Sequence, residues 1–156
     1  MITNNFNFFA SSLISQIPFD ISSLQLDHFG YQTSSSQNYE SLKEESKIIG
    51  DLISENIVSN RRVAIFKFKE PFKYQNYNIL GFELVEPKEN QECKSELDHL
   101  EFVIPVTFDE YISQYPNVEW DISAKDRDEF PKISVHLKDG KSIKFHRKDI
   151  FEEIPN

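Results

Sequence analysis

A four-residue phrase occurs twice in this chain of 156 residues, and it constrains the fold more than any other feature of the sequence. Leu26-Asp27-His28-Phe29 returns as Leu97-Asp98-His99-Leu100, 71 positions later. Each copy opens a run with the residue pattern of a short strand. A repeat at this spacing predicts two supersecondary units that share one core.

Matching elements follow the two copies in the same order. An S/T-x-x-E/Q helix-start signal comes after each opening strand, Ser34 with Gln37 in the first copy and Thr107 with Glu110 in the second. Three strand candidates then follow each helix, and Gly140 lies in a hairpin turn before the last one. The expected elements are strand 26–33, helix 37–49 and strands 51–58, 62–68 and 78–86, then strand 97–106, helix 108–115 and strands 117–123, 132–137 and 141–147.

The order β-α-β-β-β, found twice, predicts an α+β fold made of two βαβββ modules. Apolar residues at helical spacing before Pro18 predict a helical extension over residues 1–20. We expect a single domain over 21–156, with module 1 at about 24–87 and module 2 at about 96–151.

Composition narrows the class of protein. The 26 acidic residues outnumber the 17 basic ones and give a net charge of −9, which disfavours nucleic acid as a partner. Cys93 is the only cysteine, which excludes an internal disulfide framework, a cysteine-rich zinc module and a dithiol redox site. No apolar run approaches the ~18 residues of a membrane span, and residues 1–10 do not resemble a signal peptide, so we expect a cytoplasmic protein without a membrane partner.

Strand alternation places metal-capable side chains on the faces opposite the apolar ones. His28, Glu83, His99 and His146 each lie on the polar face of a different expected strand. If the two modules curl toward each other, these faces line one cleft and the four side chains converge. Imidazoles with a carboxylate form open sites for Fe(II), Mn(II), Ni(II) or Zn(II).

The chain from about Asp20 to Ile154 resembles the YecM-like family of the vicinal-oxygen-chelate (glyoxalase/dioxygenase-like) superfamily. The most specific similarity runs from Asp139-Gly140-Lys141 through Ile143-Lys144-Phe145-His146 to Glu152-Glu153-Ile154. The other matching phrases are Asp20-Ile21 with Leu26-Asp27-His28, Ser54-Glu55-Asn56 with Arg61, Glu83-Leu84 with Pro87, and Asp98-His99-Leu100-Glu101 with Ile104-Pro105.

The resemblance implies that the two modules form a U-shaped barrel around a divalent ion, which could be Fe, Mn, Ni, Co or Zn. Superfamily ligands come from the first and fourth strands of each module, which implies His28, Glu83 and His99 as metal ligands. The usual fourth ligand, a glutamate, falls at Lys144 here. His146, Glu101 or a water beside Lys144 could take that place, and His146 is our first choice because the YecM-like pattern also carries His there.

Three further residues are candidates for contact with a substrate. Glu101 shares the face of His99 and could act as a catalytic general base, as a ligand, or as an acceptor for an imidazole N–H. Arg61 could bind a substrate carboxylate in a bidentate manner, and Gln32 on the face of His28 could donate a hydrogen bond. His136, near the hairpin, is expected to be exposed and not a ligand.

The leading hypothesis is a divalent-metal enzyme of isomerase, lyase or dioxygenase type that acts on a small oxygen-rich metabolite. The first alternative is a metal-free module that binds a small ligand in the same cleft. The second is a structural or interaction protein with a decayed site. Family members include both monomers and homodimers, so both states stay open.

Overall fold

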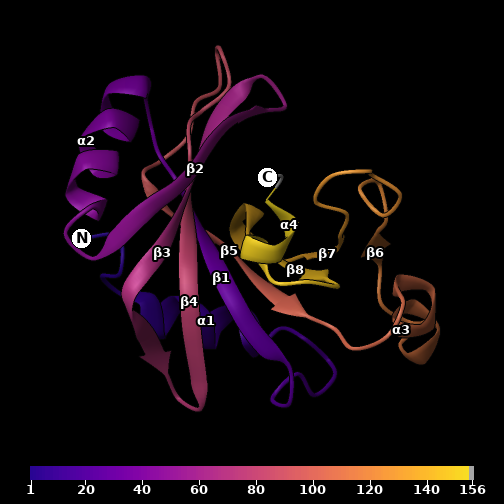
Figure 1. Ribbon diagram of the computed structural model, residues 1–156. Coiled ribbons are helices and arrows are strands. Elements are labelled where there is room, and N and C mark those ends of the chain that lie inside the picture. Colours follow the sequence, from indigo (N-terminus) through magenta and orange to yellow (C-terminus); the bar gives the residue numbers. More distant parts are fainter. Residues whose placement is uncertain (155–156) are drawn as a thin grey trace.

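The computed structural model of the protein describes residues 1–154. One mixed sheet of eight strands forms its centre, in the order β2-β3-β4-β1-β5-β8-β7-β6 (Figure 1). The chain follows the pattern βαβββ twice, which confirms the fold class predicted from the repeat. The elements are α1 Phe6–Ile14, β1 Gln25–Gln32, α2 Ser36–Ser46, β2 Gly50–Val58, β3 Arg61–Tyr74, β4 Tyr77–Val85, β5 Glu96–Val103, α3 Phe108–Gln114, β6 Trp120–Asp121, β7 Ile133–His136, β8 Ser142–His146 and α4 Ile150–Glu153, with a single 3₁₀ turn at Lys138–Gly140.

The two modules meet where their first strands pair. β1 and β5 run antiparallel to each other, while each pairs in parallel with the last strand of its own module, β4 or β8. The histidines of the repeated phrase therefore lie on adjacent strands at the middle of the sheet. The pairing of β1 with β5 thus brings the two copies of the repeated phrase next to each other.

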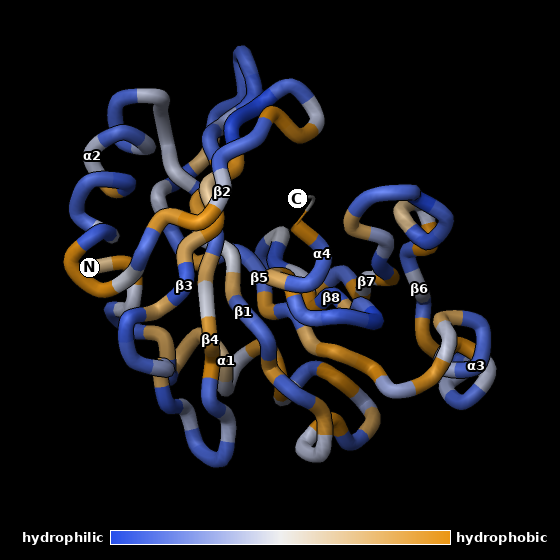
Figure 2. The backbone as a smooth tube through the Cα atoms, viewed as in Figure 1, coloured by the Kyte–Doolittle hydropathy of each residue, from blue (hydrophilic) through white to orange (hydrophobic). Residues whose placement is uncertain are grey.

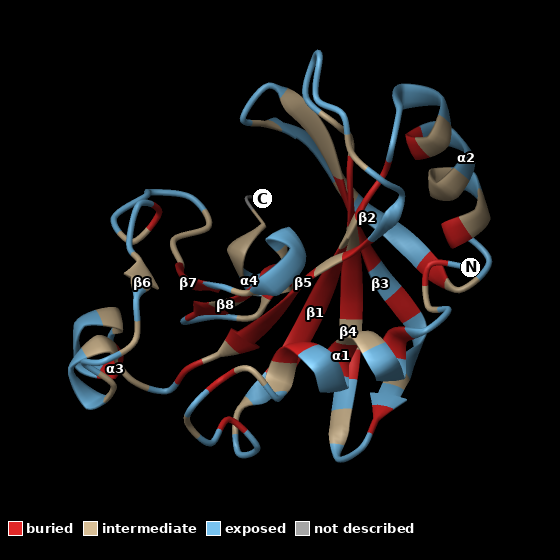
Figure 3. Ribbon diagram, turned by 180° about the vertical axis from the view of Figure 1, so that it is seen from behind, coloured by how far each residue is buried: buried red, intermediate tan, exposed pale blue. Residues whose placement is uncertain are grey.

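One face of the sheet carries the aromatic core. Phe29, Phe82, Phe102 and Phe145 are fully buried there, and the rings of Phe66 and Phe82 stack with centroids 4.9 Å apart. Figure 3 shows that burial is concentrated on the central strands β1, β4 and β5. These aromatic side chains fill one face of the strands, so the alternating residues are left for the opposite face.

Three helices cover the aromatic face. Phe6 of α1, Tyr39 of α2 and Tyr111 of α3 belong to the same core cluster as the strand aromatics. In Figure 2, α2 is mostly hydrophilic, while apolar residues recur along β3 and β4. None of the described helices is both long enough and apolar enough to cross a bilayer.

The short C-terminal helix α4 lies on the other side of the sheet, between the two modules in Figure 1. Its first backbone N–H, that of Ile150, donates to the Asp27 carboxylate of β1 over 3.0 Å. Phe151 lies over β4, where a side-chain carbon added at Gly81 would come within 2.6 Å of its ring. The chain end therefore closes one end of the space between the modules.

Several predicted boundaries were wrong. Ser35, not Ser34, caps α2 by accepting from the Asn38 N–H, whereas Thr107 caps α3 as expected. The α2 helix ends at Ser46, so Gly50 begins β2 instead of ending the helix. Two of the predicted strands also changed in length, since β3 continues to Tyr74 and the strand predicted at 117–123 keeps only two paired residues.

Candidate metal centre

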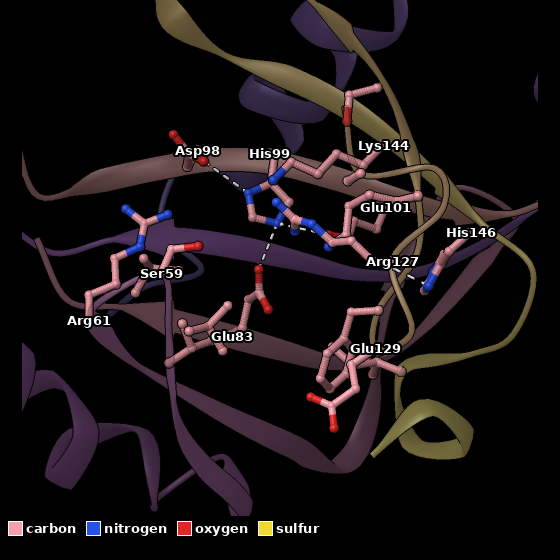
Figure 4. A pocket seen from close by; sticks show the side chains of 18 of the residues that line it. Ser59, Arg61, Glu83, Asp98, His99, Glu101, Arg127, Glu129, Lys144 and His146 are labelled. Carbon is pink, nitrogen blue, oxygen red and sulfur yellow. Dashed lines mark hydrogen bonds and ion pairs between the residues drawn. The ribbon is translucent and has the colours of Figure 1, made fainter. Parts of the chain in front are cut away.

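A cavity of about 810 Å³ lies on the face of the sheet opposite the aromatic core. Both modules line it, together with the loop before β7 and the helix α4. Figure 4 shows the polar side chains that point into it, among them Glu83, His99 and Glu101. The convergence of the two polar faces that strand alternation predicted is therefore present.

Four side chains from three strands gather at the base of this cavity. His28, Glu83, His99 and Glu101 each offer one ligand atom, and these atoms all lie within 4.8 Å of one another. The Nε2 atom of His99 is 2.8 Å from Glu83 and 3.3 Å from Glu101, and Nε2 of His28 is 3.2 Å from Glu101. Both imidazoles and Glu101 are almost fully buried, at 2% exposure or less.

The aspartate of each repeated phrase orients the histidine that follows it. Asp27 accepts from Nδ1 of His28 over 2.7 Å, and Asp98 accepts from Nδ1 of His99 over 2.9 Å. A hydrogen bond at Nδ1 leaves Nε2 as the free donor atom for a cation. Each Asp-His pair therefore presents its imidazole to the cluster with the same nitrogen.

Two β-bulges make these contacts between sequence neighbours feasible. Asp27 is an extra residue of β1, between the pairs Leu26–Phe102 and His28–Glu101. Asp98 is an extra residue of β5, between the pairs Gly30–His99 and Tyr31–Leu97. In a bulge two consecutive residues oppose one on the partner strand, so Asp and His can lie side by side. Strict alternation from His28 predicts Leu26 on the same face of β1, and this is wrong because of the bulge: Leu26 belongs to the core.

Opposite charges hold both imidazoles protonated when no cation is bound. Burial acts to lower the pKa of His28, but the carboxylates of Glu101 and Asp27 outweigh it and raise that pKa well above its usual range. Burial and the nearby Lys144 act to lower the pKa of His99, yet the surrounding carboxylates raise it to about 9. A divalent cation would replace these two protons.

The pKa values of Glu83 and Glu101 are lowered, whereas those of the two histidines are raised. Burial alone would raise the pKa of Glu83, but its ion pair with His99 lowers it to about 2. For Glu101, burial is outweighed by Lys132, 3.2 Å away, and by His28, so its pKa falls well below the usual range. Both carboxylates are ionised at neutral pH, as metal ligands must be.

His146 lies beside this group but does not belong to it. Its Nδ1 atom is 2.9 Å from Glu153 of α4, and its Nε2 atom is 3.6 Å from Asp27. It forms a second group with Asp27 and His28. The structure thus brings together three of the four predicted ligands and places Glu101, expected as the catalytic base, where His146 was expected.

The strand register identifies which residue of module 2 corresponds to Glu83 of module 1. In module 1, His28 pairs with Gly81, and Glu83 follows two residues later. In module 2, His99 pairs with Ser142, and Lys144 follows two residues later. Lys144 is therefore the counterpart of Glu83, and Glu101 of the neighbouring strand is the second carboxylate of the cluster.

The remaining candidates lie around the cavity wall. Arg61 lines the cavity, and its buried Nε atom has no hydrogen-bond partner in the described part of the chain. Gln32 also lines it, but its amide nitrogen donates to the carbonyls of Thr33 and Val85. His136 is exposed, as expected, and is 2.7 Å from Asp121.

Sequence reasoning missed four residues that support the cluster: Asp27, Asp98, Lys132 and Glu153. The repeated Asp-His dipeptide was the signal that could have identified the two aspartates. Lys132 is 31 positions from Glu101 and carries no such signal. Glu153 lay within a quoted family phrase, without an assigned role.

The donor set fits a divalent transition ion. The Nε2 atoms of His28 and His99 are buried and make no hydrogen bond of good geometry within residues 1–154. Such orphaned nitrogens, facing two ionised carboxylates, match the ligand chemistry of Fe(II), Mn(II), Co(II), Ni(II) or Zn(II).

Comparison with known proteins supports the fold and the family. The model of the YecM protein family matches residues 2–155. Protein YecM of Escherichia coli K12 is 26% identical over 91% of this chain and 82% of its own length. An uncharacterized protein of Haemophilus influenzae is 26% identical over 67% of this chain, which spans only about half of that relative's length (55%).

Solved structures show the same fold. The structural-genomics protein EC4020 superposes with a TM-score of 0.75 and 22% identity, over 95% of this chain and 85% of its own. A methylmalonyl-CoA epimerase in complex with methylmalonyl-CoA and NH4⁺ superposes with a TM-score of 0.58 and 15% identity, over 85% of this chain and 99% of its own. The expected vicinal-oxygen-chelate fold is confirmed.

Proposed function

Because the chain belongs to the YecM family and carries a buried group of two histidines and two glutamates, we propose that it is a divalent-metal-dependent enzyme. Its substrate is a small oxygen-rich metabolite that enters the cavity between the modules. The metal ligands of this proposal are His28, Glu83, His99 and Glu101. The metal is one of Fe, Mn, Ni, Co and Zn.

The observation that carries the proposal is the pair of orphaned Nε2 atoms. His28 and His99 each have Nδ1 fixed by an aspartate, while Nε2 faces carboxylates inside the cavity base. In the metal-free protein each Nε2 carries a proton and faces a carboxylate at 3.2 Å or less without good hydrogen-bond geometry, and a divalent cation would replace that proton. The preceding aspartates raise the basicity of the ligands and set their orientation.

His146 is not one of the four proposed ligands, but it contacts the residue that orients one of them. Its contacts with Glu153 and Asp27 link α4 to the aspartate that orients His28. The bulge at Asp27, the backbone N–H of Ile150 and His146 together hold one buried carboxylate in place. In the proposal His146 is therefore a positioning residue, and Glu101 replaces it as the fourth ligand.

When bound, the metal supplies a Lewis acid that polarises substrate oxygens. We assign proton transfer to Glu101 because it is the carboxylate at the cavity base that contacts Lys132 and both imidazoles. Arg61 and Gln32 line the same cavity and contact the far part of the substrate. The buried cavity base excludes bulk water from the reacting atoms.

An isomerase-type reaction is favoured over oxygenation by the solved structures that share the fold. Several are methylmalonyl-CoA epimerases, in complex with 2-nitronate-propionyl-CoA or with methylmalonyl-CoA. Those ligands belong to the epimerases, and the reaction type is carried over to this chain on the shared fold. Metal-assisted isomerisation uses a cation and a proton-transfer carboxylate, and this cavity offers residues for both.

Metal stoichiometry in protein purified without a His-tag tests the proposal. We expect close to one transition ion per chain after loading, and at least a tenfold loss of affinity in His28→Ala and His99→Ala. Glu101→Ala should lose the metal as well, whereas His146→Ala should keep more of it. His136→Ala is the matched control, since this histidine is exposed and bound to Asp121.

The outcomes separate the alternatives. Wild-type protein that takes up none of the five metals would leave the metal-free binding module as the function. Full metal in both the His28 and His99 variants would show that the ligands lie elsewhere. Loss of metal in His146→Ala with retention in Glu101→Ala would restore His146 as the fourth ligand.

A further inference from the structure

Lys144 places a positive charge in the cavity at a position where the corresponding residue of module 1 is a carboxylate. Lys144 occupies in module 2 the register position that Glu83 occupies in module 1. Its side chain lines the cavity and lies beside His99 in Figure 4. It pairs with Glu101 in the β5–β8 ladder, which places it directly beside the cluster.

Lys144 has no counter-ion of its own. No ion pair or side-chain hydrogen bond involves it within residues 1–154, although acidic residues exceed basic ones in this chain. The neighbouring carboxylates already have partners: Asp98 holds His99, and Glu101 holds Lys132 and His28. The Lys144 side chain is partly buried, and an anionic ligand in the cavity would supply the partner that residues 1–154 do not.

The charge of the loaded site indicates what that anion is. A divalent cation balances Glu83 and Glu101, and Lys132 is already paired with Glu101. Asp27 and Asp98, on the two histidines, and Glu153, on His146, keep further negative charges around the cavity base. Lys144 therefore suits a singly charged carboxylate better than a phosphate dianion, which these acidic groups would repel.

The geometry points to an organic acid as the substrate class, with its carboxylate bound by Lys144 and a neighbouring oxygen directed to the metal. This inference rests on the proposed function, because one oxygen of the acid is directed to the proposed metal. It assigns a binding partner to Lys144, which lies at the position of the fourth superfamily ligand. Arg61, further along the same wall, is the candidate for a second acidic group. In this inference, position 144, which holds a metal ligand in the superfamily, holds a substrate-binding residue in this protein.

Malonate is a suitable probe, and its neutral analogue malonamide is the ligand control. Titration calorimetry at constant free Mn(II) compares wild-type protein with Lys144→Gln, Lys144→Arg and, as a matched surface control, Lys148→Gln. We expect Lys144→Gln to bind malonate about tenfold more weakly, the size of one lost charge-assisted hydrogen bond. Lys144→Arg should stay within about threefold of wild type, and Lys148→Gln should not change.

The Mn(II) content of each variant is measured first, so the two proposals fail differently. Equal malonate affinity in Mn(II)-loaded wild type and Lys144→Gln, or no malonate binding by wild type at millimolar concentration, would overturn the assignment of Lys144. So would loss of Mn(II) from Lys144→Gln, or a Lys144-dependent response to inorganic phosphate but not to malonate. If wild-type protein takes up no Mn(II), the titrations use whichever of the other four metals it does bind. If it binds none of the five, the metal proposal fails, and the same titrations on metal-free protein decide whether Lys144 binds the acid.

Discussion

The imidazole of His99 occupies the space that a side chain on Gly30 would fill. Gly30 lies opposite His99 in the β1–β5 ladder, and a carbon added at Gly30 would overlap three atoms of the ring. Because Gly30 has no side chain, the candidate ligand His99 of β5 can occupy this position. Glu101 is the module 2 counterpart of Gly30 and lies against His28 in turn.

Gly30→Ala is expected to displace His99 and to weaken metal binding at least tenfold. The reason is steric, since the added methyl group and the ring cannot share one position, and overpacking of this kind costs about 1–3 kcal/mol of stability. Metal titration and urea unfolding measure the two effects. Gly140→Asn is the control, because Gly140 has a positive φ that Asn tolerates and open space around it. Unchanged affinity in Gly30→Ala would mean that His99 does not bind the metal.

Asp27→Asn and Asp98→Asn should each lower metal affinity about 10–100-fold, because each removes the charge that orients an imidazole. Asp27→Asn should also destabilise the fold more than Asp98→Asn. Asp27 is fully buried and accepts from Ile150 of α4, whereas Asp98 is 34% exposed. Metal titration and denaturant unfolding compare the pair with Asp139→Asn in the exposed turn. Equal affinities in all three variants would exclude the orienting role.

The metal-free protein should lose stability as the pH rises from about 6.5 to 9. The pKa of His99 is raised to about 9, so its contribution is complete below the unfolded value near 6.5 and disappears as the pH passes 9. The loss is up to about 3 kcal/mol for this shift. The lowered pKa of Glu83 acts at the other end, where its contribution falls away between about 4.5 and 2. Unfolding by urea across this range, with His99→Gln as the comparison, measures the effect; a flat profile in wild type would contradict it.

Metal affinity should rise over the same alkaline range, because the ion competes with the protons on His28 and His99. Dye-competition titration with Zn(II) between pH 6.5 and 8.5 measures this dependence. The rise should be smaller in His99→Ala, which has one fewer proton to displace. A pH-independent affinity would indicate ligands that are already deprotonated.

Phe82→Ala should cost about 3–5 kcal/mol of stability, because its fully buried ring packs between Phe66 and Phe29. Phe8→Ala is the matched control, since Phe8 is 80% exposed and the same atoms are removed. Chemical denaturation compares the two. Similar losses in both variants would mean that the aromatic face is not the stabilising core.

The repeat, the capping residues and the alternation of apolar side chains were enough to predict the order of elements and the face of each strand that carries the chemistry. These signals are local: residues within a few positions set a helix start, a turn or an alternation. Boundaries were less well predicted where tertiary pairing extends or shortens a strand. β3 is long because β4 offers it a partner as far as Tyr77, and β6 is short because β7 pairs with only two of its residues.

The sequence by itself determined that this protein is two βαβββ modules, each opened by a strand that carries an Asp-His dipeptide. It also limited any metal ligands to histidine and carboxylate, since one cysteine cannot form a thiolate site. Only the tertiary structure decided which carboxylate joins His28, Glu83 and His99. Two β-bulges turn Asp27 and Asp98 toward the histidines, and the register of β5 against β8 brings Glu101 into the cluster while it leaves Lys144 in the position of the missing glutamate. Those choices depend on pairing between residues far apart in the chain, which no local pattern records.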